Sequence, residues 1–310
     1  MRILFDESLV SRVSWVGLLV LSACEVSVDA PESTEPSAAA SQQRLANTSR
    51  GNHGTNGDYD GDGRTDYAVF QPRNSGNWRV RSSGVSAAVT EVQWGLPNDI
   101  SVPADYDGDG LTDIAVFRPG EGNWYTRFSS LRYVLSPTDY YNLTPVQWGL
   151  PGDTPVPGDY NGDGFVDRAV FRPSDRNWYL NFSAQGLFFP TQGLGPQPAV
   201  HFGEPNDVPV PGDYDGNGTT DLAVFRPGSP ARWILRDPAT GGELPGVEWE
   251  SGVIPVPGDY DNDGATDMAV FDPRSGNWRV RAPNGVVTQT HWGEFLDVPV
   301  PGDYDGDSQL

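Results

Sequence analysis

The chain has no lysine, only one cysteine, and no hydrophobic run long enough to cross a bilayer. A single cysteine excludes an internal disulfide, so any cross-link within the fold has to come from bound metal. The net charge of −22 argues against binding to nucleic acid. The 37 glycines and 28 prolines predict many short strands joined by turns, without long helices.

Aspartate is abundant, and it recurs in a nine-residue pattern. Complete copies occupy residues 58–66, 105–113, 159–167, 213–221 and 259–267, and a sixth, incomplete copy begins at Asp303. Each complete copy places oxygen-bearing side chains at positions 1, 3, 5 and 9, around a glycine at position 6. Close carboxylates repel one another by about 4 kcal/mol per pair near a protein surface. A divalent ion removes this repulsion, and calcium takes six to eight oxygen ligands from loops of this kind.

The expected calcium ligands are the side chains at positions 1, 3, 5 and 9 and the backbone carbonyl at position 7. They are Asp58, Asp60, Asp62, Arg64 and Asp66; Asp105, Asp107, Asp109, Leu111 and Asp113; Asp159, Asn161, Asp163, Phe165 and Asp167; Asp213, Asp215, Asn217, Thr219 and Asp221; and Asp259, Asp261, Asp263, Ala265 and Asp267. The residues at position 7 share no side-chain type, as expected if only the main chain binds the ion there. We therefore expect about five calcium sites.

Two other interpretations of the loops were weighed. An EF-hand needs a bidentate glutamate at position 12 and flanking helices, whereas position 12 is valine in every complete copy, within an apolar run. A metal-free Asp-Gly turn would use the same residue types. Five loops with one internal pattern favour metal over this second alternative.

The loops also mark a structural repeat. Successive copies begin 47, 54, 54, 46 and 44 residues apart, and such a period is typical of propeller blades and solenoid turns. Around each loop lie a V-P-V-P run, an A-V-F run, a tryptophan strand and a final W-G run. Proline within a sheet belongs on an edge strand, such as the innermost strand of a blade. The pattern predicts an all-β chain that folds as a β-propeller of four-stranded blades.

The units resemble FG-GAP repeats, also called VCBS repeats, which form the blades of the integrin α-subunit propeller and of many bacterial surface proteins. The resemblance covers residues 56–310 and rests on the D-x-D-x-D-G-x-x-D loop. It implies a calcium ion held in a hairpin between the first two strands of each blade. Asn161 and Asn217 replace carboxylates of that motif, so we expect weaker binding at these two sites.

Five blades are expected if the ring closes through its ends. The first unit lacks a V-P-V-P run, and the sequence carries an additional one at residues 298–302. That run would complete the first blade. The alternative is an open or truncated array, because residues 303–307 would crowd the first loop upon closure.

The N-terminus resembles the signal of a bacterial lipoprotein. Residues 1–23 contain a short apolar run after Arg2 and Arg12, and they end in Leu-Ser-Ala before Cys24. The resemblance implies cleavage before Cys24 and acylation of its side chain, followed by a disordered tether over residues 24–55. Glu25 favours an outer-membrane or cell-surface location. The alternative is an ordinary secretory signal with a chance cysteine.

The expected function is that of a lipid-anchored, monomeric adhesion or binding module for a protein or glycan partner. His201 and His291 share a position with Gln and Glu in other units, which indicates an outward polar site, and no catalytic motif accompanies them. We do not expect an enzyme. Longer segments in the second and third units carry candidate contact residues, unless these segments are hairpins packed on their neighbours: Tyr133, Tyr140, Tyr141, Phe188 and Phe189. The alternatives are a purely structural envelope component and an enzyme with a site built from loops.

Overall fold

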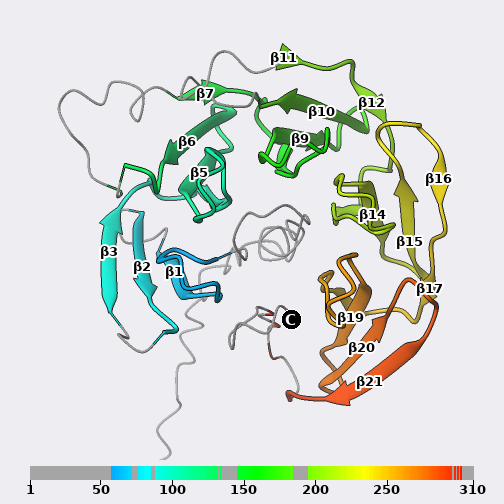
Figure 1. Ribbon diagram of the computed structural model, residues 1–310. Helices are drawn as coiled ribbons and strands as arrows, with labels where there is room; N and C mark the ends of the chain where they lie inside the picture. Colours follow the sequence, from blue (N-terminus) through cyan, green and yellow to red (C-terminus); the bar gives the residue numbers. More distant parts are fainter. Residues whose placement is uncertain are drawn as a thin grey trace, which may run out of the picture. The chain divides into compact units, whose positions relative to one another are not determined.

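The computed structural model describes residues 57–71, 76–84, 88–131, 133, 145–183, 195–294, 297, 299 and 301. These residues form 21 strands and no helix. The strands make five antiparallel sheets arranged as the blades of a β-propeller (Figure 1). The predicted all-β propeller is therefore confirmed, and so is the number of blades.

The blades follow one another along the chain. Blade 1 contains β1 (Tyr67–Gln71), β2 (Asn77–Arg81) and β3 (Val89–Gln93). Blade 2 contains β4 (Ile100–Ser101), β5 (Ile114–Arg118), β6 (Asn123–Arg127) and β7 (Val146–Gln147). Blade 3 contains β8 (Thr154–Pro155), β9 (Arg168–Arg172), β10 (Asn177–Phe182), β11 (Gly195–Pro196) and β12 (Val200–His201). Blade 4 contains β13 (Val208–Pro209), β14 (Leu222–Arg226), β15 (Ala231–Arg236), β16 (Glu243–Leu244) and β17 (Glu248–Trp249). Blade 5 contains β18 (Ile254–Pro255), β19 (Met268–Asp272), β20 (Asn277–Arg281) and β21 (Val287–His291).

The strand order within a blade follows the chain from the inside outward. In blades 2 to 5 the first strand pairs with the second, the second with the third, and the third with the outer strand or strands. The short first strand comes from the V-P-V-P run, and in blade 3 Pro155 pairs with Val170. The prolines therefore lie on the inner edge strand, as the sequence predicts.

The outer edges of blades 3 and 4 differ from the single final strand expected for each unit. In blade 3, β11 and β12 pair with opposite ends of β10. In blade 4, β16 and β17 likewise pair with opposite ends of β15. Prolines interrupt both outer segments, at Pro198 and Pro245, because proline lacks the N–H that a ladder needs.

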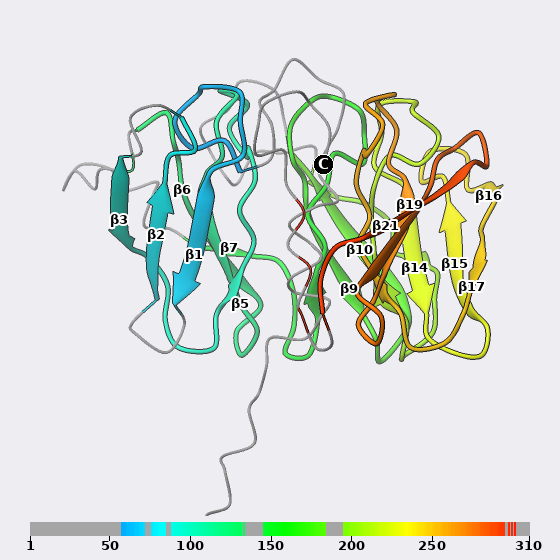
Figure 2. The same cartoon turned by 90° about the horizontal axis from the view of Figure 1, so that it is seen from below.

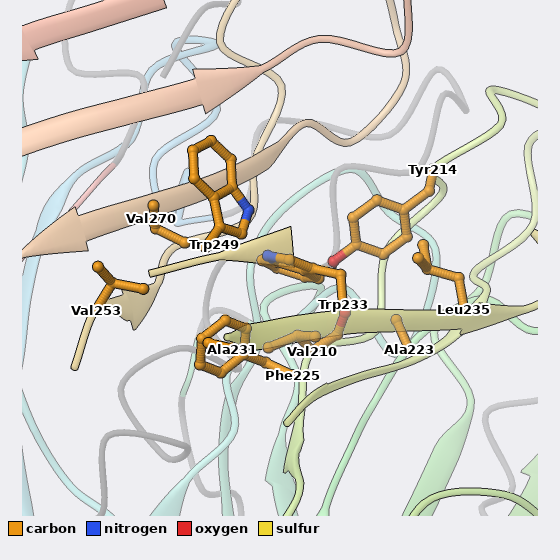
Figure 3. Close-up of a cluster of buried hydrophobic side chains, with 10 residues drawn as sticks. All are labelled: Val210, Tyr214, Ala223, Phe225, Ala231, Trp233, Leu235, Trp249, Val253 and Val270. Carbon is orange, nitrogen blue, oxygen red and sulfur yellow. The ribbon is translucent and has the colours of Figure 1, made fainter. Parts of the chain in front are cut away.

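The cores of blades 1 to 4 are each built around one tryptophan, on β2, β6, β10 and β15. Trp78, Trp124, Trp178 and Trp233 are almost fully buried. In blade 4 the ring of Trp233 lies 5.6 Å from that of Tyr214 and 5.8 Å from that of Phe225, in edge-on geometry (Figure 3). Aromatic pairs of this kind stabilise a core beyond the area that they bury.

Neighbouring blades share their cores through a valine of the second strand. Figure 3 includes Val270, which belongs to β19 of blade 5 but packs in the core of blade 4. Val116, Val170 and Val224 make the equivalent contact with the blade before their own. All four are fully buried, so the four seams between consecutive blades are packed like a protein interior.

The seam between blades 5 and 1 differs from the other four. Val69, the equivalent valine of blade 1, is 51% exposed, and Trp292 of blade 5 is 78% exposed. The strand expected to close the ring falls on residues 298–302, and of these only Pro299 and Pro301 are among the described residues. Closure through this strand stays a prediction.

Candidate metal-binding loops

The five acidic loops occupy the same place in each blade. Loops 1 to 5 are residues 58–66, 105–113, 159–167, 213–221 and 259–267, and each precedes the second strand of the four-strand pattern. In Figure 2 the loops before β1 and β19 lie on the same upper side. A backbone bridge closes each of loops 2 to 5, as between Ala104 and Asp113 or between Gly258 and Asp267. The loops are thus hairpin ends fixed by the sheet.

The aspartate at position 1 organises its loop from within. In loop 1, Asp58 Oδ1 accepts a hydrogen bond from Gly61 N at 2.7 Å and Asp58 Oδ2 accepts one from Gly63 N at 2.9 Å. The bond from the position 6 amide recurs in every loop, at 2.7 to 2.9 Å. Gly63 has a φ of 82°, a conformation that glycine adopts without steric cost. The backbone amides therefore orient this carboxylate within its loop.

The aspartate at position 9 is deeply buried in every loop, and in loops 2 to 5 it is the most deeply buried of the acidic side chains. Asp113, Asp167, Asp221 and Asp267 have no exposed surface, and Asp66 has 3%. In each, Oδ2 accepts a hydrogen bond from the amide at position 2, as in Tyr214 N to Asp221 Oδ2 at 2.9 Å. The other oxygen, Oδ1, faces different surroundings in different blades.

In the first three loops only, the backbone amide of a serine donates a hydrogen bond to Oδ1 of the position 9 aspartate. Asp66, Asp113 and Asp167 accept through Oδ1 from Ser83, Ser129 and Ser183, respectively, at 2.6 to 2.8 Å. In loops 4 and 5, Asp221 Oδ1 and Asp267 Oδ1 are buried and have no hydrogen-bond partner among the described residues. Pro283 follows Asp267 at the serine spacing and has no N–H to donate. A buried, unpaired carboxylate oxygen is costly, and a cation would satisfy it.

Carboxylates converge in four of the loops. The groups that bring one oxygen each within 4.8 Å of the others are Asp58, Asp60 and Asp62; Asp105, Asp107 and Asp113; Asp213, Asp215 and Asp221; and Asp259, Asp261 and Asp263. Loop 3 has Asn161 at position 3, and its amide Nδ2 donates to Asp163 Oδ2 at 3.2 Å. The side-chain atoms that could bind an ion in these loops are all oxygens, which is the ligand type that calcium prefers. The ligand roles assigned from the sequence, including the position 7 carbonyls, stay predictions.

Burial opposes ionisation of these carboxyl groups. It raises the pKa of Asp107 to about 6, of Asp267 to about 7, and of Asp167 and Asp221 to about 8. Neighbouring carboxylates of the same loop raise the pKa of Asp221 and Asp267 further. A bound divalent cation would reverse both effects, because it favours the charged form.

The raised pKa values predict how the metal-free protein responds to pH. A carboxyl group whose folded pKa lies above its unfolded value near 3.9 contributes stability below pH 4, and this contribution is lost as the pH rises through the folded pKa. For Asp167, Asp221 and Asp267 this loss begins near pH 4 and is complete only above about pH 7 to 8. Protein stripped on a chelating resin should therefore unfold at lower urea concentration at pH 8.5 than at pH 5.5. Asp267→Asn should reduce the difference, and a higher midpoint at pH 8.5 would contradict the prediction.

The other residues singled out in the sequence lie apart from the loops. His201 and His291 are exposed, with Nδ1 of each 3.1 Å from the side-chain oxygen of Asn177 and Asn277, respectively. Their expected outward position is confirmed. Cys24 lies outside the described residues, as do residues 1–23 and the tether. Within the part of the chain that the structure describes, no helix is long and apolar enough to span a bilayer.

Of the two alternatives given for the longer segments, Tyr133 takes the second: it packs on its neighbours and is not an exposed contact residue. Its hydroxyl donates to Thr112 O at 2.6 Å, and its ring packs against the core of blade 1. This aromatic side chain thus points inward, where it contacts loop 2. The other aromatic candidates, Tyr140, Tyr141, Phe188 and Phe189, lie outside the described residues.

The serines that support the loops were missed by sequence reasoning. Besides their amides, Ser82 Oγ donates to Asp60 Oδ2 at 2.5 Å and Ser130 Oγ donates to Asp107 Oδ2 at 2.5 Å. These serines follow the tryptophan strand, 16 to 23 residues after the carboxylates that they contact. Their regular position after that strand in the first three units was the available signal.

Two family models match the chain. A model described as FG-GAP-like repeat matches residues 58–116, and one described as FG-GAP repeat matches residues 98–135. Together they cover loops 1 and 2 with the strands around them. No curated protein matches the chain significantly.

Several solved structures are similar to the chain at low identity. BBS1N in complex with ARL6DN has 12% identity and a TM-score of 0.41, and the match covers 74% of this chain and 65% of that one, slightly less than two thirds of its length. Virginiamycin B lyase from Staphylococcus aureus has 9% identity and a TM-score of 0.40, with 76% and 71% covered. The WD40 domain from Toxoplasma gondii coronin has 13% identity and a TM-score of 0.37, with 76% and 60% covered. At these TM-scores the similarities carry no argument about function.

Proposed function

Since the chain is an FG-GAP repeat propeller, we propose that it is a calcium-stabilised binding module of a bacterial cell envelope. The fold is consistent with a binding or adhesion module. The observation that carries the calcium proposal is the pair of buried oxygens, Asp221 Oδ1 and Asp267 Oδ1, for which the part of the chain that the structure describes offers no donor. Both belong to loops in which several carboxylates lie side by side.

The residues that would hold calcium are the oxygen-bearing side chains at positions 1, 3, 5 and 9, with the carbonyl at position 7. The ion supplies positive charge, which offsets the repulsion among the carboxylates and the cost of burying them. The chain's own contribution is to hold the position 1 and position 9 carboxylates in place through backbone amides. Five bound ions would reduce the net charge from −22 to about −12.

Metal stoichiometry tests this proposal directly. Protein stripped of metal and then dialysed to equilibrium against millimolar calcium should bind about five ions per molecule, measured by elemental analysis of the protein and buffer compartments. Asp221→Asn should lose one ion. Glu91→Gln is the matched control, because Glu91 forms only an exposed ion pair with Arg79 on the outer part of blade 1. Uptake of fewer than about three ions would refute the proposal.

We further propose that Cys24 carries a lipid anchor, after cleavage of residues 1–23. The support is the Leu-Ser-Ala-Cys sequence that follows a short apolar run. Several acyl chains give stable attachment where one would not. Mass spectrometry of the mature N-terminus should find acylated Cys24, and Cys24→Ser should move the protein to the soluble fraction. An unmodified N-terminus at another residue would indicate an ordinary secretory signal.

The partner at the envelope is a protein or a glycan under this proposal. A screen of surface glycans and envelope proteins, with calcium and with EDTA, should find binding that EDTA abolishes. A purely structural role is the second candidate, and the inward position of Tyr133 favours it. Calcium-dependent stability without binding to any partner in the screen would support that second candidate.

A further inference from the structure

Neighbouring loops are joined directly by their backbones. The amide at position 8 of one loop donates to the carbonyl at position 1 of the loop before it. The four bonds are Thr112 N to Asp58 O at 2.7 Å, Val166 N to Asp105 O at 3.4 Å, Thr220 N to Asp159 O at 2.6 Å, and Thr266 N to Asp213 O at 2.6 Å. All five loops thus form one continuous row, which Figure 1 shows beside β1, β5, β9, β14 and β19.

A glycine and a threonine accompany each short bond. Gly158 and Gly212 directly precede loops 3 and 4, and a Cβ added to Gly158 would lie 2.7 Å from Thr220 Cγ2. One added to Gly212 would lie 2.8 Å from Thr266 Oγ1. Between loops 1 and 2, Gly57 N donates to Thr112 Oγ1 at 2.9 Å. At Gly158 and Gly212 the missing Cβ lets the threonine of the next loop approach closely enough for the backbone bond.

The junction between loops 2 and 3 is the exception. Ala104 stands where the other junctions have glycine, and Val166 stands where they have threonine. The backbone bond at this junction is also the longest of the four, at 3.4 Å. A hydrogen bond of that length is weak compared with bonds of 2.6 to 2.7 Å.

We propose that the loops bind calcium in two coupled groups, loops 1 and 2 and loops 3 to 5, separated by the weak junction at Ala104 and Val166. This proposal rests on the proposed calcium binding, and it adds that the sites change one another's affinity for the ion. Within a group, an ion in one loop raises the affinity of the next. Across the weak junction this effect is small.

The coupling follows from where the bonded groups lie. Position 1 is an expected ligand, and position 8 lies between the expected ligands at positions 7 and 9. An ion that orders position 1 of one loop therefore also fixes the ligand backbone of the next, which then loses less entropy upon binding. The buried, unpaired Asp221 Oδ1 and Asp267 Oδ1 point independently to a ligand in two loops of the second group.

A calcium titration of the stripped, full-length chain tests the coupling. Bound ions are counted by calorimetry, and near-ultraviolet circular dichroism follows the buried tryptophans. The expected result is about five ions with a Hill coefficient above 1. Gly158→Ala should leave the number of ions unchanged, weaken half-saturation of the second group roughly fivefold, and lower the Hill coefficient.

Further variants separate coupling from folding defects. Thr112→Val keeps the shape of the side chain but removes the acceptor of Gly57 N, so it should lower the Hill coefficient of the first group even if Gly158→Ala fails to fold. The double variant Ala104→Gly, Val166→Thr should couple the two groups of loops and raise the Hill coefficient of calcium binding. Gly120→Ala is the control, since no atom lies within 4 Å of an added Cβ there.

The outcomes distinguish the two proposals. Five ions bound with a Hill coefficient of 1, unchanged by Gly158→Ala and Thr112→Val, would overturn the coupling and leave calcium binding intact. Failure of the wild-type chain to bind calcium would overturn the proposed function itself.

Discussion

Millimolar calcium is expected to raise the thermal unfolding midpoint of the stripped protein by roughly 15 to 25 °C. A site with a dissociation constant near 10⁻⁴ M contributes about 1.4 kcal/mol at about 1 mM free calcium. Five such sites contribute about 7 kcal/mol, which is comparable with the whole stability of an ordinary domain. For a domain of this size, each kcal/mol shifts the midpoint by about 2 to 4 °C. Differential scanning calorimetry at several calcium concentrations would measure the effect.

The calcium dependence has an internal control in the loops themselves. Asp221→Asn should remove about a fifth of the shift, or more if loops 3 to 5 are coupled. Sodium chloride at matched ionic strength should not reproduce the effect of calcium, because ionic screening alone does not replace a divalent ion bound between carboxylates. An unfolding midpoint that is the same in calcium and in EDTA would remove the structural role assigned to the ion.

Trp178→Ala is expected to lower the free energy of unfolding by about 3 to 5 kcal/mol. The side chain has no exposed surface, and its ring lies 5.6 Å from that of Phe171. The indole Nε1 also donates to Phe202 O at 3.1 Å, and truncation leaves this carbonyl without its donor. Urea unfolding in saturating calcium would give the difference.

Trp292→Ala provides the matched control for this substitution. Trp292 is 78% exposed, so its truncation should change the free energy of unfolding by less than about 0.5 kcal/mol. A loss at Trp292 as large as that at Trp178 would show that the seam between blades 5 and 1 is packed in solution. In that case the ring would be closed more tightly than the exposure of Val69 indicates.

The blade architecture could be predicted because every level of the sequence repeats. Loop, apolar strand and tryptophan strand recur in fixed order, and proline placed the first strand at an edge. The division of the outer strands could not be predicted with the same ease, since a proline such as Pro245 fits both a loop and an interrupted strand. For Tyr133 the sequence left open an exposed position and a packed one, because sequence alone cannot say which side of an insertion faces the core.

The sequence predicted the candidate ligands within each loop, but not the hydrogen bonds that join neighbouring loops. The positions of Asp58 or Asp221 within their loops follow from local spacing. The bond from Thr220 N to Asp159 O joins residues 61 positions apart, and it exists only because consecutive blades lie side by side. The sequence shows Ala104 and Val166 in place of glycine and threonine. Only the structure shows that the two residues belong to the same junction between neighbouring blades.

The alternation of valine and proline in the first strands has a consequence for behaviour at high concentration. Val156 N donates to Ala169 O of the second strand, and successive amides of a strand point to opposite sides. Pro155 and Pro157 therefore occupy the positions whose N–H groups would face the unpaired side. Without these donors the innermost edges cannot template the addition of a foreign strand, so the propeller presents little opportunity there for aggregation between molecules.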